Sequence, residues 1–195
     1  MPADAPLLLA AGGGQGAQQI NGLMLDIAPK LLAANPKLQI VHVVGIGLAG
    51  QMSEQQIKDA YAKILPANNL QRLTTLSFTG DFYTYSGAAD LIITRAGASA
   101  MAEFALQTKA CIVIPSSVLA GGHQIKNAQV LKDTDAAKVL PADASASQLL
   151  KAVSGLLDNP SARSKLAANL SSTDRPDAAK DLAKIILEQA RNNQF

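Results

Sequence analysis

Tryptophan is absent from the 195-residue chain, which holds four phenylalanines and three tyrosines as its aromatic residues. Charge of either sign is also scarce, because 17 lysines and arginines face 15 aspartates and glutamates and leave a formal net charge of +2. Proteins that bind nucleic acid usually present a basic face, aromatic side chains for base stacking, or both. The composition therefore argues against nucleic acid as a partner.

Cysteine is nearly absent as well, and the single residue, Cys111, rules out a disulfide within the chain. It lies in the apolar stretch 110–114, where a small buried thiol is favoured over a nucleophile. The sequence also lacks a basic leader with an apolar segment behind it, and an uninterrupted apolar run of about 18 residues. We expect a cytoplasmic protein, with contact at a membrane surface left open.

Short apolar runs, rich in β-branched residues, alternate with amphipathic segments along the chain, of which 48% is hydrophobic. This alternation predicts an α/β fold with a Rossmann-like parallel sheet and helices on both faces. We expect a single domain over residues 1–195, with residues 1–6 as a linker before the first strand. The predicted strands cover residues 7–10, 38–44, 73–78, 91–94, 111–114 and 137–140.

The segments between these strands show helical spacing of apolar residues and helix-starting signals. Ser53 and Gln56, for example, have the spacing of a capping box, which indicates a helix that begins after Ser53. The predicted helices cover residues 17–34, 53–63, 99–106, 124–131, 145–157, 161–170 and 177–189. In open sheets of this kind ligands bind beyond the carboxyl ends of the strands, so the loops at that edge are the candidate site.

The loop at residues 11–17 is glycine-rich and joins the first predicted strand to the first predicted helix. Glycine allows backbone N–H groups to approach a phosphate closely, and the positive end of the helix dipole lies at the same place. A phosphate-bearing ligand is the first hypothesis. A plain tight turn between strand and helix remains the alternative for the loop taken alone.

Gly12, Gly14 and Ala17 also satisfy the relaxed dinucleotide fingerprint, which keeps a nicotinamide or flavin oxidoreductase as an alternative. Such a site wants an acidic residue at the end of the second strand, and residues 43–47 supply none. A nucleoside-triphosphate P-loop is excluded because no Lys-Ser or Lys-Thr follows the glycines.

A second loop follows the strand at 91–94 and contains Arg95, Gly97 and Ala98. Ser99 is the predicted N-cap of the next helix, and the amides around it would be available to an oxyanion. Glu103 would lie on the same helical face one turn later, where its carboxylate could accept hydrogen bonds from a ribose diol. The alternative is that Glu103 is a solvated helix acid paired with Arg95.

A third group follows the strand at 111–114, after a loop of small residues. His123, Gln124 and Asn127 supply an imidazole and two amides, which are neutral hydrogen-bonding groups suited to sugar hydroxyls. The spacing indicates no metal site, because carboxylate and thiol partners are missing from it.

Taken in chain order, these motifs resemble the C-terminal half of the MurG family of UDP-N-acetylglucosamine transferases, which make lipid II from lipid I in peptidoglycan synthesis. The resemblance covers nearly the whole chain. It rests on residues 12–17, Asn21, 78–81, Ala89, Asp90, 94–98, Glu103, Pro115, His123, Gln124, Asn127 and Ala128. It implies the GT-B architecture, in which two Rossmann-like domains face each other and the C-terminal one holds the nucleotide-sugar donor.

The resemblance also implies roles for individual residues. Gly14, Gln15 and Gly16, with the amides around Ala98 and Ser99, would serve the diphosphate, beside Arg95 in the same loop. Thr79 would contact the uracil base through its backbone, with Phe82 packed nearby. Glu103 would bind the ribose hydroxyls, and His123, Gln124 and Asn127 would bind the N-acetylglucosamine. The family usually has serine where Gly14 stands.

The family's N-terminal domain, which carries the acceptor site, the catalytic base and the membrane-facing patch, has no counterpart in this sequence. We therefore expect UDP-N-acetylglucosamine as the ligand, no metal or other cofactor, and no catalytic base in this chain. A lipid-linked acceptor and contact with the cytoplasmic face of the inner membrane would depend on the other domain. An alternative is a stand-alone UDP-sugar-binding subunit that needs a separate acceptor protein.

Overall fold

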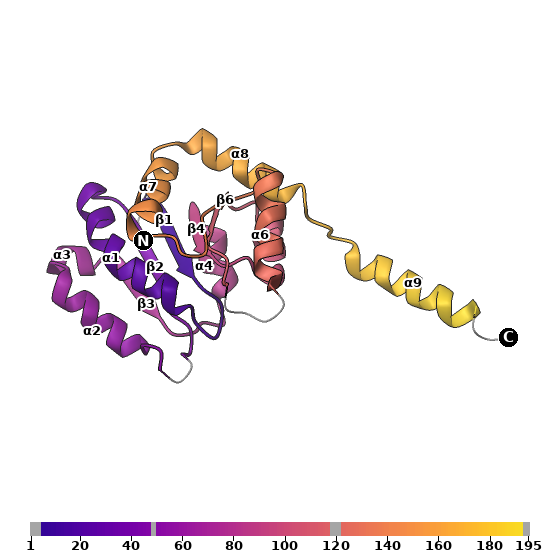
Figure 1. Ribbon diagram of the computed structural model, residues 1–195, viewed down its shortest axis with the longest axis horizontal. Helices are drawn as coiled ribbons and strands as arrows, with labels where there is room; N and C mark the ends of the chain where they lie inside the picture. The colour runs from indigo at the N-terminus through magenta and orange to yellow at the C-terminus, as the bar shows by residue number, and fades with distance from the viewer. Residues whose placement is uncertain (1–4, 48–49, 118–121, 193–195) are drawn as a thin grey trace.

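The computed structural model describes residues 5–47, 50–117 and 122–192. Its centre is a six-stranded sheet in the order β3-β2-β1-β4-β5-β6, and every neighbouring pair is parallel. The strands are β1 (Leu7–Ala11), β2 (Gln39–Val43), β3 (Leu73–Leu76), β4 (Leu91–Thr94), β5 (Cys111–Val113) and β6 (Lys138–Val139). The predicted Rossmann-like α/β fold is confirmed (Figure 1).

Helices cover both faces of the sheet. They are α1 (Gln18–Ala34), α2 (Glu54–Ile64), α3 (Ala67–Leu70), α4 (Phe82–Ala88), α5 (Ala98–Leu106), α6 (His123–Asp133), α7 (Ala146–Leu157), α8 (Pro160–Ser171) and α9 (Ala178–Asn192). Side chains of a strand point alternately to the two faces, and β1 shows this plainly. Leu8 packs in the core that α1, α2 and α7 cover, whereas Leu9 packs in the core under α4, α5 and α6.

The topological switch point, where the strand order reverses, lies between β1 and β4 at the middle of the sheet. From β1 the chain proceeds outward to β2 and β3, and it then returns to β4 on the other side of β1. The loops that follow β1 and β4 therefore diverge above the same pair of strands. A crevice at this point is the usual ligand site of doubly wound sheets.

Several boundaries differ from those predicted from the sequence. The helices α3 and α4 were not predicted, and the third predicted strand, 73–78, ends at Leu76. Residues 1–4 of the predicted linker lie outside the described residues, while the Pro6 carbonyl already accepts a hydrogen bond from the Gln39 N–H at 2.9 Å. The prediction that Cys111 is buried is confirmed, and burial raises the pKa of its thiol to about 12.

The last helix, α9, extends away from the rest of the chain on a linking segment (Figure 1). Its apolar side chains Leu182, Ile185, Ile186 and Leu187 are each more than half exposed. Within the described residues, no helix combines the length and the apolar character needed to cross a membrane.

Candidate functional site

The glycine loop between β1 and α1 is held by direct backbone contact with the segment that follows β2. The Gly16 N–H donates to the Gly13 carbonyl at 2.9 Å and closes the turn, and the Ile46 N–H donates to the Gly14 carbonyl at 3.0 Å. A Cβ on Gly45 would lie 2.2 Å from the Gly16 nitrogen, and Gly45 has a φ of +86°. Glycine is thus required where the two loops touch.

The loop after β4 leads into α5, whose first backbone N–H groups have no partner within the helix. Gly97 is the N-cap, and no side chain caps the helix. The prediction that Ser99 is the N-cap is therefore wrong: Ser99 lies inside the first turn. Ser99 is exposed two positions after the cap. The backbone amides of Ala98, Ser99 and Ala100 lie at the helix N-terminus, where an anion is favoured.

A cavity of about 360 Å³ joins the two loops. Gly13 and Gly14 line it from the glycine loop, and Ser99 and Glu103 line it from α5. The predicted shared face of Ser99 and Glu103 is confirmed by this arrangement. The other lining residues are Ala11, Val43, Ser77, Phe78, Thr79, Gly80, Phe82, Thr94, Ala100 and Phe104.

Arg95 and Glu103 do not form the ion pair that the alternative interpretation expected. Within the described residues, Glu103 makes no salt bridge, and its partly buried carboxylate lines the cavity. Arg95 does not line the cavity; it is partly buried at the end of β4, and burial lowers the pKa of its guanidinium. The carboxylate of Glu103 is thus available to a ligand in the cavity.

The wall opposite α5 comes from the segment between β3 and α4. The Ser77 N–H donates to the Glu54 carboxylate at 2.7 Å, and Glu54 also pairs with Lys58. The hydrogen bonds from Lys58 and Ser77 lower the pKa of Glu54, so this carboxylate stays ionised at neutral pH. The hydrogen bond between Ser77 and Glu54 fixes the backbone just before Phe78 and Thr79, which line the cavity.

Phe82 begins α4, and its ring packs against that of Phe104, with centroids 6.2 Å apart. Thr79 accepts a hydrogen bond from the Asp81 N–H at its own Oγ1, at 3.1 Å, so its side chain is engaged within the turn. Phe78 was not among the predicted site residues although it lines the cavity while 65% exposed. The available signal was a phenylalanine at the end of a predicted strand, at the sheet edge where ligands bind.

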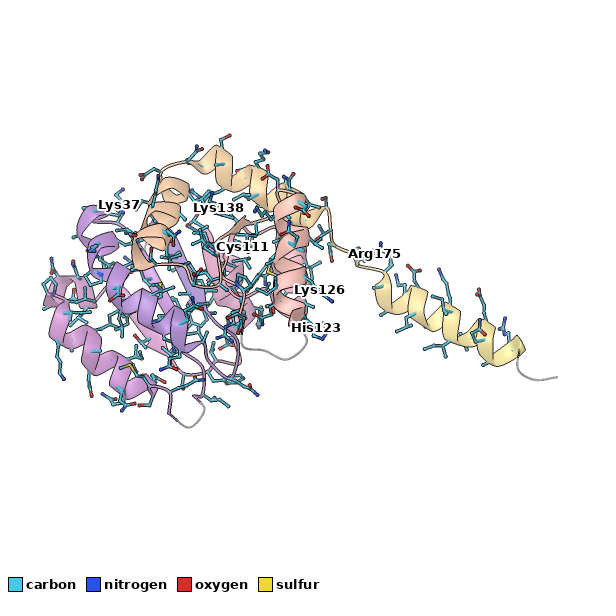
Figure 2. The ribbon with its side chains drawn as sticks, viewed as in Figure 1. Lys37, Cys111, His123, Lys126, Lys138 and Arg175 are labelled. Carbon is cyan, nitrogen blue, oxygen red and sulfur yellow. The ribbon has the colours of Figure 1, made fainter. Side chains whose placement is uncertain are left out.

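The third predicted group lies at the start of α6, and none of its residues lines the cavity. Gln124 accepts a hydrogen bond from the Ser116 N–H at 2.9 Å, and Asn127 donates to the Ala96 carbonyl at 3.0 Å. These amides tie α6 to the loops after β5 and β4. His123 is exposed at the lower end of α6 in Figure 2.

Gln15, Gly16 and Ala98 flank the cavity without lining it. Gln15 and Ala98 are exposed, whereas Gly16 is buried against Val44. Across the described ranges, no cluster of three or more His, Cys, Asp or Glu side chains could hold a metal ion.

Solved structures show which class of protein has this arrangement. MurG of Acinetobacter baumannii superposes with a TM-score of 0.74 at 28% identity, over 96% of this chain and 51% of that one. A Staphylococcus aureus MnaA–UDP structure superposes with a TM-score of 0.71 at 13% identity, over 96% of this chain and 47% of that one, which shows the fold alone. The parallel sheet and the superposition on MurG place the chain in the GT-B glycosyltransferase class.

The family model of the glycosyltransferase family 28 C-terminal domain matches residues 7–182, and the chain belongs to this family. Among its relatives is a UDP-N-acetylglucosamine–N-acetylmuramyl-(pentapeptide) pyrophosphoryl-undecaprenol N-acetylglucosamine transferase of Thermoanaerobacter sp. (strain X514). It is 35% identical in an alignment of 191 positions that covers 94% of this chain and 48% of that relative. The enzyme of the same name from Anaeromyxobacter dehalogenans (strain 2CP-C) is 29% identical over 188 residues, which are 96% of this chain and 46% of that relative. The chain spans about half the length of these relatives, and the membership gives no support to the oxidoreductase alternative.

Proposed function

We propose that this chain is the donor-binding half of an N-acetylglucosaminyltransferase and binds UDP-N-acetylglucosamine. One observation carries the proposal: a single cavity joins a glycine loop, a helix N-terminus and a partly buried carboxylate. These are the groups that a nucleoside diphosphate requires, since amides and a helix dipole suit its phosphates and a carboxylate suits its ribose. The names of the relatives supply the identity of the sugar nucleotide.

In this proposal the diphosphate lies between Gly14–Gly16 and the first turn of α5. Backbone N–H groups of the first turn of α5 and of the glycine loop, other than that of Gly16, which donates to the Gly13 carbonyl, would bind the phosphates, so binding would not depend on a metal or on another cofactor. Arg95, partly buried at the end of β4, adds a positive charge beside the same loop. The developing negative charge on the leaving UDP would be stabilised by this preformed set of donors.

The nucleoside would occupy the cavity itself. Glu103 accepts hydrogen bonds from the ribose hydroxyls, and the backbone around Thr79 contacts the uracil. Phe82 supports that wall through its contact with Phe104. The apolar lining on both sides excludes water from the base.

The sugar would extend from the diphosphate toward the start of α6. His123 is exposed there, and Gln124 and Asn127 each have one amide atom engaged with the neighbouring loops. These three residues would contact the N-acetylglucosamine directly or fix the loop that does so. Their test is the difference between affinity for UDP and affinity for UDP-N-acetylglucosamine.

The whole protein would transfer N-acetylglucosamine to a lipid-linked acceptor and form lipid II, as the names of the relatives indicate. An acceptor hydroxyl would attack the anomeric carbon, the bond from that carbon to the phosphate oxygen would break, and a base would take the proton. We infer that the acceptor site and this base lie in the half of the protein that this chain does not correspond to, since the chain covers 48% of the relative. Any contact with the cytoplasmic face of the inner membrane belongs to the same part.

Calorimetry of the chain with four ligands tests the proposal. We expect binding of UDP-N-acetylglucosamine and UDP, weaker binding of UDP-glucose, no binding of NADH, and no transfer by this chain alone. Equal indifference to all uridine ligands would overturn the proposal, and measurable NADH affinity would favour a dinucleotide site.

A single substitution tests the role of Glu103. Glu103→Ala should weaken UDP binding by about 1–3 kcal/mol, because it removes a charge-assisted hydrogen bond to the ribose. The matched control is Glu188→Ala, which removes a glutamate from the exposed helix α9. Unchanged affinity in a folded Glu103→Ala variant would return this residue to the role of a solvated helix acid.

A further inference from the structure

Three buried polar side chains from three different elements form a connected chain beneath the glycine loop. Tyr61 of α2 and His42 of β2 are fully buried, and Asn21 of α1 is 4% exposed. The Tyr61 hydroxyl lies 3.0 Å from His42 Nδ1, and His42 Nε2 lies 3.1 Å from Asn21 Oδ1. Asn21 Nδ2 donates to the Val44 carbonyl at 3.1 Å.

The donor and acceptor of each of these hydrogen bonds follow from the last group in the series, the Val44 carbonyl. The Val44 carbonyl can only accept, so the amide NH₂ of Asn21 must face it and Asn21 Oδ1 must face His42. His42 therefore carries its proton on Nε2, and Nδ1 accepts from the Tyr61 hydroxyl. Burial lowers the pKa of His42 to about 4 and raises that of Tyr61, which keeps the imidazole neutral and the phenol protonated.

The Val44 carbonyl connects the hydrogen-bonded side chains of Tyr61, His42 and Asn21 to the candidate site. The next two residues contact the glycine loop: Gly45 lies against Gly16, and the Ile46 N–H donates to the Gly14 carbonyl. A Cβ on Gly16 would lie 2.7 Å from the same Val44 carbonyl oxygen. The position of this oxygen thus decides how closely the two loops approach.

We propose that Tyr61, His42 and Asn21 are positioning residues that hold the Val44 carbonyl and, through residues 44–46, set the conformation of the phosphate-binding glycine loop. They touch no ligand and act through Asn21 alone. This inference rests on the proposed UDP binding for its functional consequence. Its structural content, a glycine loop fixed from below by a directed hydrogen-bond chain, stands without a ligand.

The test compares Asn21→Ala with Asn69→Ala, which also removes a buried, hydrogen-bonded asparagine. Asn69 accepts a hydrogen bond from Arg72, whose guanidinium also donates to the Leu38 carbonyl. Leu38 lies at the amino end of β2, whereas Val44 follows its carboxyl end. We expect Asn21→Ala to raise the dissociation constant for UDP about tenfold, the effect of losing one hydrogen bond, while Asn69→Ala leaves it unchanged. Equal effects of the two variants on affinity would overturn the positioning role.

A second pair of variants separates positioning from packing. His42→Gln keeps a donor amide near the Nε2 position and should retain most of the UDP affinity, whereas His42→Leu keeps only apolar bulk and should lose it about tenfold. If both variants bind UDP equally well, the directed hydrogen-bond chain does not act on the site.

Amide hydrogen exchange without ligand distinguishes this inference from the proposed function. The Ile46 N–H reports on contact between the two loops, and Asn21→Ala should accelerate its exchange about tenfold more than Asn69→Ala does. If the unsubstituted chain fails to bind UDP but this difference is seen, the proposed function fails and the positioning role stands. If Ile46 exchanges alike in both variants, the positioning role fails whatever the chain binds.

Discussion

Gly14 stands where the resemblance to the family predicts a serine. Its neighbours Gly16 and Gly45 need glycine, because both have positive φ and a Cβ would collide with backbone. Gly14 differs: a Cβ built there meets no atom within 4 Å, and the residue lines the cavity. The position therefore has room for a side chain at the wall of the cavity.

We expect Gly14→Ser to fold, to gain about 0.4–1 kcal/mol of stability through lower unfolded-state entropy, and to bind UDP about threefold to tenfold more tightly through a hydroxyl contact to phosphate. Calorimetry and urea unfolding measure the two effects. Gly45→Ser is the control, since its Cβ would lie 2.2 Å from the Gly16 nitrogen and it should be destabilised. Weaker UDP binding by a stable Gly14→Ser variant would show that the phosphates lie elsewhere.

At this scale the sequence predicted the kind of residue better than its contacts. Glu103 was found because helical spacing sets which residues share a face, and it does line the cavity. The cap was misplaced from Gly97 to Ser99 because a backbone-only cap leaves no side-chain signal. The chain of Asn21, His42 and Tyr61 was missed because it depends on three side chains brought together by folding.

At the scale of elements, the sequence predicted what local chemistry determines. The predicted capping box at Ser53, which begins α2, is formed, because Ser-x-x-Gln satisfies two backbone donors by itself. The structure adds a second capping box, at Ser145, which begins α7. The end of β3 at Leu76 was predicted less well, since a strand ends where its neighbour stops pairing. The short α4 was missed because seven residues that include glycine carry little periodicity.

The three elements α1, β2 and α2 share the buried imidazole of His42, so their packing should depend on pH. The pKa of His42 falls from 6.5 in the unfolded chain to about 4 in the fold, and the unfolded state therefore binds more protons between these values. The resulting stability is complete above pH 6.5 and is lost as the pH falls toward 4. We expect a loss of about 2 kcal/mol from this group between pH 7.5 and pH 5, measured by urea unfolding.

His42→Gln is the comparison for this prediction, because it keeps a polar side chain that does not titrate. The difference in unfolding free energy between the original chain and His42→Gln should shrink as the pH falls from 7.5 to 5. A difference that stays constant over this range would show that His42 does not titrate there on unfolding.

At the scale of the whole molecule, α9 contrasts with the rest of the chain. All side chains described in α9 are exposed, and Figure 1 shows the helix lying apart from the sheet and its covering helices. Helical stability in proteins comes mainly from packing of an apolar face, and α9 packs against nothing within the described residues. The fold of residues 5–171 should therefore not depend on it.

A chain ending at Arg175 should unfold in urea with a free energy within about 0.5 kcal/mol of the original, because the removed residues whose burial is described, 176–191, are all exposed. Its UDP affinity should also be unchanged, since the cavity lies at the carboxyl ends of β1 and β4 and no residue of α9 lines it. A loss above 1 kcal/mol would mean that α9 packs on the body of the molecule in solution.

The backbone contact between Gly16 and Gly45 bears on how donor preference could diverge among proteins with this fold. On the side of the cavity where we propose the diphosphate, main-chain contacts at Gly16 and Gly45 fix the path of the glycine loop, so this path does not depend on the side chains that line the cavity. The wall where we propose the nucleoside is lined by side chains, among them Phe78, Phe82 and Glu103. Selection for a different base could therefore change the wall of Phe78, Phe82 and Glu103 and leave the proposed diphosphate contacts unchanged. Libraries built to change the donor should be confined to that wall.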